Sequence, residues 1–153
     1  MAKHVEAVAS DSRKPTMPLF VFENDFMWVF PVQRDAEVDL ECYDVLDGAY
    51  VAFDAQGRKL RLDCAEESAP LFMSLAEEEP THAEDLRRRI LLHLEEYSKI
   101  PAPEDTSLAA LVDHCLAFKI SVTTFKRPDG PLRRRLFRWF LSLFGVSPRA
   151  DKG

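Results

Sequence analysis

Histidine and cysteine are the side chains best suited to binding a metal, but their spacing here does not predict a metal site. The chain has 4 His and 3 Cys, and no two of them are separated as in the C-x-x-C or H-x₃-H pairs that hold zinc. His93 lies one heptad after Leu86 on the apolar side of a predicted helix. We therefore expect His93 in the core, bonded to a backbone carbonyl, and we expect no metal or other cofactor.

Nucleophilic and acid–base chemistry also lack the patterns they require. His114 and Cys115 are adjacent, and consecutive helical residues point about 100° apart, so they cannot act as a base–nucleophile pair. With only 5 Gly, the chain has no G-x-S-x-G elbow and no glycine-rich phosphate loop. Nothing marks an acidic pair such as Asp39 and Glu41 as desolvated, which general acid–base catalysis requires. We therefore predict that the protein is not an enzyme.

Charge is distributed unevenly along the chain. The net charge is −6, but residues 35–79 hold thirteen acidic residues against three basic ones, whereas residues 131–153 hold six basic residues against one acidic residue. An acidic field repels nucleic acid and anionic lipid and attracts basic protein surfaces. We expect a protein partner and no nucleic acid. The alternative is that the charge serves only to keep the protein in solution.

The acidic residues begin in a stretch that alternates between apolar and polar side chains. Val38, Leu40 and Cys42 alternate with acidic residues, which is typical of a strand with one buried face. Turns at Asp47-Gly48 and at residues 54–57 would join this strand to strands over 50–53 and 60–63. An earlier hairpin, over 19–22 and 26–30, is apolar at nearly every position, as expected for strands covered on both faces.

This arrangement would gather carboxylates on the exposed face of the first strand of the meander. Negative charges steer a basic partner, and an aromatic ring at the end of the row can anchor it. The alternative is an ordinary solvated face of an antiparallel sheet. The predicted contact residues are Glu37, Asp39, Glu41, Tyr43, Asp44, Asp47 and Asp54.

Three helices are expected between Cys64 and residue 120. A short helix would open at Ser68 or Pro70 and end before Pro80, and Ser107 or Asp105 would cap the third. The second has Thr81 and Glu84 at the spacing of a capping box. It also has Glu84 and Asp85 four residues before Arg88 and Arg89, and an apolar stripe over Leu86, Ile90, Leu94 and Tyr97. A strand over residues 120–125 would rejoin the sheet.

A last helix is predicted over residues 132–144, with Pro131 at its first turn and Gly145 as its stop. Its apolar side is opposed by arginines, and its apolar run is too short to span a bilayer. It could pack on the sheet with its arginines facing the acidic half, dock into a partner or a second copy, or contact a membrane surface. The candidate docking residues are Arg134, Arg135, Arg138 and Trp139.

Together these features predict an α+β fold, an antiparallel β-meander of four to five strands packed on one face by three to four helices. The domain would cover residues 19–146, between flexible tails at 1–18 and 147–153. Three cysteines without close pairing indicate reduced thiols in a cytoplasmic protein, and one disulfide with a spare thiol is the alternative.

The function that these features favour is a non-enzymatic acidic module that binds another protein through its acidic sheet face. An inhibitor or immunity-type protein has this physical character, as bacterial immunity proteins that neutralise a cognate toxin do; the likeness is one of type and not of family. The alternative is an adaptor or chaperone-like protein that docks through the helix over residues 132–144. A third class, an enzyme that uses acidic residues, would need convergent polar groups in a deep pocket. Homodimerisation is left open.

Overall fold

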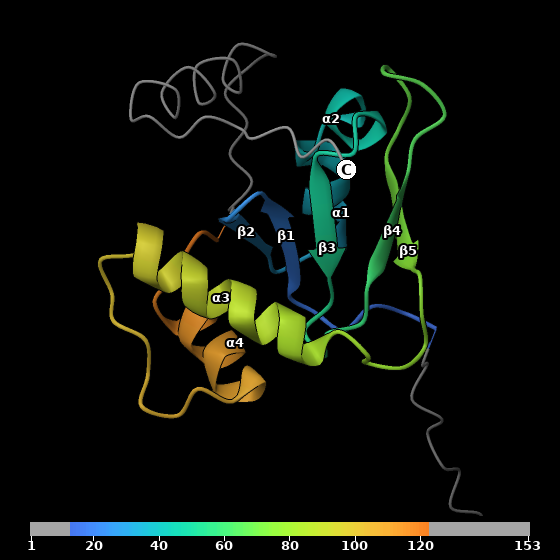
Figure 1. Cartoon of the computed structure of the whole chain (residues 1–153). Coiled ribbons are helices and arrows are strands. Elements are labelled where there is room, and N and C mark those ends of the chain that lie inside the picture. Colours follow the sequence, from blue (N-terminus) through green and yellow to red (C-terminus); the bar gives the residue numbers. More distant parts are fainter. Residues whose placement is uncertain (1–12, 123–153) are drawn as a thin grey trace, which may run out of the picture.

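A computed structural model describes residues 13–122 of the chain (Figure 1). Helices and antiparallel sheets are both present, which confirms the α+β class. Within these residues the strands form two separate sheets, one of three strands and one of two. The predicted single meander of four to five strands is therefore wrong.

The three-stranded sheet is the centre of the described chain. Its strands are β1 (Leu19–Glu23), β2 (Phe26–Phe30) and β3 (Tyr50–Phe53), in the order β2-β1-β3. The hairpin predicted for β1 and β2 is confirmed, and Asn24 takes the positive φ of 54° that its two-residue turn requires.

Helices α3 (Ala83–Tyr97) and α4 (Leu108–Ala117) cover one face of this sheet (Figure 1). The predicted stripe of α3 is confirmed, with Leu86, Ile90 and Leu94 all buried against Phe20 and Phe22 of β1. At the start of α4, Ser107 Oγ accepts a hydrogen bond from the Ala110 amide at 3.3 Å, as its predicted capping role requires.

The opposite face is covered as well, so the prediction of helices on one face only is wrong, whereas the expectation that the strand over 19–22 is covered on both faces is confirmed. Here pack helices α1 (Gln33–Asp39) and α2 (Cys42–Leu46) and the second sheet, formed by β4 (Leu60–Asp63) and β5 (Phe72–Leu75). Leu19 and Val21 of β1 point into this second core. Both faces of β1 are therefore buried, and this accounts for its continuous apolar sequence.

The acidic strand predicted over residues 37–43 does not exist, because this stretch folds as α1 and α2. Ala36 and Leu40, four residues apart, are the buried positions of the first helix and its C-cap. Gly48, at φ 72°, follows the C-cap of α2, where its amide bonds to the Val45 carbonyl and the Ala49 amide bonds to the Asp44 carbonyl. These two bonds form a Schellman motif, so the Asp47-Gly48 turn ends a helix and does not join two strands.

Two further local predictions are wrong. The stretch assigned to a short helix before Pro80 contains the strand β5. Helix α3 begins at Ala83 without a side-chain cap, and the Thr81 hydroxyl donates to the Glu77 carboxylate at 2.8 Å. The capping box is therefore absent, because His82 is the N-cap and Thr81 lies one residue before it.

The described chain ends beside β2. Val122 forms an isolated parallel bridge with Val29, and the Val29 amide donates to the Ser121 carbonyl at 2.9 Å. The predicted return of the chain to the sheet is confirmed at this one bridge. Residues 120 and 121 of the predicted strand lie in a turn, with Ser121 at φ 51°, so the strand is wrong there. Residues 123–125 and the helix over residues 132–144 lie outside the described residues.

Candidate functional site

The seven predicted contact residues do not share one surface. Glu37 is one that forms internal hydrogen bonds instead. Its Oε1 accepts hydrogen bonds from Gln33 Nε2 at 2.9 Å and from the Met73 amide at 3.1 Å. Gln33 in turn donates to the Met73 carbonyl at 2.9 Å. Glu37 therefore fastens α1 to β5 and is a structural residue.

Asp54 is completely buried, at 0% exposure. Its carboxylate accepts from Arg58 Nε at 2.8 Å and from the backbone amides of Thr16, Gln56 and Arg58 at 2.9 to 3.0 Å. Arg58 extends the network by donating to the Lys14 carbonyl at 2.9 Å. Asp54 thus closes the loop after β3 and holds the segment that precedes β1, so it cannot reach a partner.

Asp44 is buried too, and its Oδ2 accepts a hydrogen bond from the Tyr50 hydroxyl at 3.1 Å. This bond joins α2 to the first residue of β3. A short helix with few core residues is oriented by such a contact, because its own hydrogen bonds are too few to stabilise it alone. Asp44 is therefore a structural residue as well.

The remaining four predicted residues stay near solvent. Asp39, Tyr43 and Asp47 are exposed and Glu41 is half-buried, at positions along and between α1 and α2. The predicted carboxylates are therefore divided, some in internal bonds and some on the outside of two short helices. No exposed sheet face carries them.

A disulfide joins α2 to the two-stranded sheet. Cys42, the first residue of α2, is bonded to Cys64, which follows β4. The Cys42 Sγ also lies 3.1 Å from the Ala69 carbonyl oxygen, in the loop between β4 and β5. The prediction of three reduced thiols is wrong, and the alternative of one disulfide with a spare thiol is the one observed. Burial raises the pKa of the spare thiol, Cys115, to about 12, so it is not a nucleophile at neutral pH.

The disulfide and the Glu37 bonds place the β4–β5 loop at the same end of the molecule as α2 (Figure 1). We call residues 35–47 and 63–72 the acidic end. These residues include nine acids and no lysine or arginine. Three large side chains there are more than half exposed: Tyr43 at 51%, Leu46 at 53% and Phe72 at 62%.

Sequence reasoning missed half of this surface. Phe72 was placed in a helix, and the exposed pair Glu66-Glu67 was assigned no role although both are acidic and lie close to Cys64. The signal that could have found them was the pairing of Cys42 with Cys64, since a disulfide between these residues brings residues 63–72 to α2.

Breaking the disulfide should cost about 3 kcal/mol of stability, the chain-entropy value for a loop of 22 residues. The double variant Cys42→Ser/Cys64→Ser should unfold at correspondingly lower urea than the oxidised protein. Dithiothreitol should lower the stability of the unsubstituted chain by a similar amount and leave the double variant unchanged. An equal response of both proteins to dithiothreitol would contradict the assignment.

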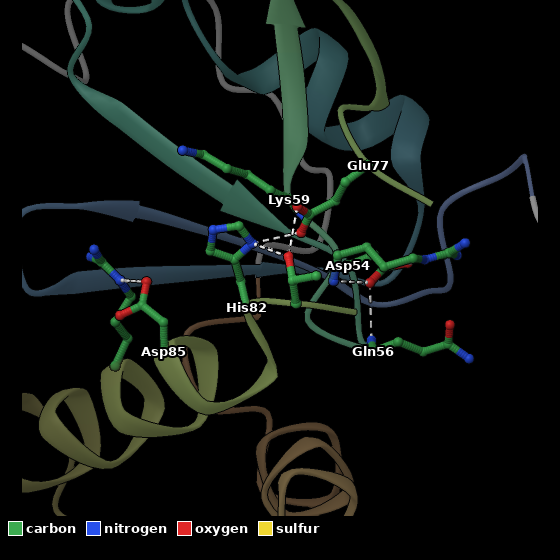
Figure 2. A network of polar contacts seen from close by, with 9 residues as sticks. Asp54, Gln56, Lys59, Glu77, His82 and Asp85 are labelled. Carbon is green, nitrogen blue, oxygen red and sulfur yellow. Dashed lines mark hydrogen bonds and ion pairs between the residues drawn. The ribbon is translucent and has the colours of Figure 1, made fainter. Parts of the chain in front are cut away.

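A second polar cluster lies at the other end of the two-stranded sheet, around Glu77 (Figure 2). The Glu77 Oε1 accepts from the Lys59 amide at 2.8 Å and lies 2.6 Å from His82 Nδ1. The Thr81 hydroxyl donates to Glu77 Oε2 and lies 3.0 Å from the same His82 nitrogen. Partial burial acts to raise the pKa of Glu77, but the bonds from Lys59, His82 and Thr81 together lower it.

This cluster does not have the geometry of a nucleophile–base–acid triad. In such a triad the hydroxyl and the carboxylate contact opposite nitrogens of the imidazole. Here Thr81 and Glu77 both meet Nδ1 of His82. The contacts instead join the start of β4 to the residues that precede α3, which is a structural role.

His93 is buried in the core, as predicted, although its backbone partner differs. Its Nδ1 accepts from the Met27 amide at 3.1 Å, and its Nε2 lies 2.8 Å from the Ser121 hydroxyl. Desolvation lowers the pKa of His93, and the backbone of Asp25 partly opposes this. The neutral ring therefore bridges β2, α3 and the end of the described chain.

Three further features bear on the site. A cleft of about 480 Å³ lies beside the end of α3, lined by residues between Leu91 and Ala102, and it includes none of the polar clusters above.

Within residues 13–122 no three His, Cys, Asp or Glu side chains are grouped to hold a metal ion, and no helix could cross a membrane. Arg134, Arg135, Arg138 and Trp139, the second candidate site, lie outside the described residues.

Comparison of the chain with protein-family models, with curated proteins and with solved structures gives no match.

Proposed function

We propose that this protein is a non-enzymatic binding module whose acidic end occupies the basic surface of another protein, in the manner of an inhibitor or immunity-type protein. The observation that carries this proposal is the composition of the acidic end, which has no lysine or arginine, five exposed acids (Asp39, Asp47, Asp63, Glu66 and Glu67) and three exposed large side chains. The proposed contact surface is formed by two short helices and a loop. The sequence had suggested the exposed face of a sheet.

Charge of one sign over a small surface speeds association with an oppositely charged protein. Residues 35–57 contain no lysine or arginine, nor do residues 62–72, although Arg61, just outside these stretches, pairs with Asp63 at 2.9 Å. Such steering weakens as salt is added, because the screening length is only about 8 Å at physiological ionic strength. The proposal therefore implies strongly salt-dependent binding.

The exposed side chains supply the apolar part of the proposed contact. Tyr43 and Leu46 lie three residues apart on α2, hence on neighbouring positions of one helical face. Phe72 begins β5 and is the most exposed large hydrophobic residue of the described chain. Aromatic anchors surrounded by charged residues are typical of protein–protein contacts.

The disulfide favours an oxidising compartment for this function over the cytoplasm that the sequence led us to expect. Disulfides persist outside the reducing cytosol and are rare within it. The Cys42–Cys64 bond also holds the two halves of the acidic end together. A partner in the same compartment would therefore meet a preorganised surface, which lowers the entropic cost of binding.

The test compares two reversals of adjacent glutamate pairs that change the net charge equally. Glu66→Lys/Glu67→Lys alters the acidic end, whereas Glu78→Lys/Glu79→Lys alters exposed residues outside it. Each variant and the unsubstituted protein would serve as bait in cell extract, and retained proteins would be identified by mass spectrometry. We expect a basic protein that the unsubstituted protein and the 78/79 variant retain and that the 66/67 variant loses.

Association of the purified pair would then be measured by stopped flow. The 66/67 reversal should slow association about tenfold or more at low salt and flatten its salt dependence, whereas the 78/79 reversal should have a much smaller effect. Equal recovery on all three baits, or equal association rates, would overturn the proposed surface.

A further inference from the structure

The direction of the chain at the end of the described residues points toward the acidic end. Val122 pairs with Val29 in the parallel sense, so the chain there runs the same way as β2. Beyond Val29, β2 ends at Phe30 and leads into α1 at Gln33. At Val122 the chain is therefore directed as β2 is where it leads into α1.

The chain that follows is the chemical complement of the acidic end. Residues 131–153 carry six basic residues and one acid, and they include three Phe, four Leu and one Trp. Eight residues, 123–130, separate this segment from Val122, enough to span about 28 Å when extended. Opposite charge, apolar side chains on both sides and a short connection favour contact within one molecule, where the effective concentration is high.

We infer that the basic segment 131–153 binds the acidic end of its own chain, with arginines against the carboxylates and aromatic side chains against Tyr43, Leu46 and Phe72. This contact needs no partner protein, so it stands independently of the proposed function. Where that function also holds, the segment and the partner compete for one surface.

Trp139 allows the contact to be measured in the full-length protein. The chain has 2 Trp, and Trp28→Phe leaves Trp139 as the single tryptophan, whose emission is excited selectively over that of the tyrosines. Acrylamide, a neutral quencher, reports how far Trp139 is shielded from solvent. Where Trp28→Phe perturbs folding, as seen by circular dichroism, subtracting the signal of a Trp139→Phe variant from that of the unsubstituted protein gives the same quantity.

We expect Trp139 to be shielded at low salt and to become about twofold or more quenchable in 1 M NaCl, where charges are screened beyond about 3 Å. Glu66→Lys/Glu67→Lys should produce the same rise at low salt, whereas the matched control Glu78→Lys/Glu79→Lys should not. Adding Arg134→Glu/Arg135→Glu to the 66/67 variant should restore shielding, since opposite charges then face each other again.

Two outcomes would overturn the inference. Equal quenching in the 66/67 and 78/79 variants would place Trp139 away from the acidic end. Shielding that disappears on dilution, with a matching fall in mass by light scattering, would assign the contact to a second copy and not to the same chain.

Discussion

Replacing Gly57 with alanine should lower the free energy of unfolding by about 3 kcal/mol or more. Gly57 has φ 83°, which strains any residue with a Cβ. The Cβ of an alanine at this position would lie 2.3 Å from the Ala83 Cα and 2.6 Å from the Ala83 nitrogen. These are backbone atoms at the start of α3, so no side-chain rotation can relieve the overlap. Urea denaturation followed by circular dichroism would measure the loss.

Gly48 provides the matched control, because it has a similar φ of 72° and no other atom lies within 4 Å of the place that a Cβ would occupy. Alanine there should cost only the backbone strain, about 1 to 2 kcal/mol. The difference between the two substitutions then measures the close approach of the loop to α3. Equal losses at both positions would show that this approach does not constrain the fold.

Replacing Asp54 with alanine should destabilise the protein by about 3 to 5 kcal/mol, the range observed when one member of a buried ion pair is removed. The substitution removes the carboxylate from Arg58, which is only 4% exposed, and leaves the backbone amides of Thr16 and Gln56 without this acceptor. Thermal and urea unfolding would both detect a loss of this size.

Two further variants separate this effect from a general loss of charge. Glu79→Ala, at an exposed acid, should change stability by less than about 0.5 kcal/mol. Asp54→Ala/Arg58→Ala should be less damaging than the sum of its single substitutions, because neither buried charge then remains without the other. Additive losses would show that the Asp54–Arg58 pair is not energetically coupled.

The elements predicted correctly are those whose sequence signals are local and strong. The β1–β2 hairpin has two apolar runs around Asn24, and α3 has an apolar stripe at Leu86, Ile90 and Leu94. In each case local conformation and burial favour the same structure. The turn at Gly57 was also predicted correctly, because a glycine that can adopt a left-handed φ is itself a local signal for a turn.

The stretch over residues 37–43 was predicted wrongly because a short window satisfied two periodicities. Ala36 and Leu40 are four residues apart, a spacing that places them on one face of a helix and equally on one face of a strand, so their burial fits both patterns. Gly48 was equally ambiguous, since a residue with positive φ ends helices as well as turning hairpins.

The negative charge of the candidate site could be predicted from the sequence, but which of its residues are exposed could not. The excess of acidic residues is visible in the sequence, whereas the burial of Asp44 and Asp54 depends on Tyr50 and Arg58, which only the tertiary structure brings to them. The exposure of Phe72 likewise depends on the pairing of β5 with β4. Contacts of this kind have no local signature, so composition alone could not separate structural carboxylates from exposed ones.

The position of β1 implies a hierarchy in amide hydrogen exchange. β1 is hydrogen-bonded to a strand on each side, and its side chains alternate between the two cores. Its amides can therefore exchange only when the whole domain opens, and they report global stability. The short helices α1 and α2 have few backbone hydrogen bonds of their own, so their amides should exchange sooner by local fraying, while the Cys42–Cys64 bond keeps α2 attached to the second sheet.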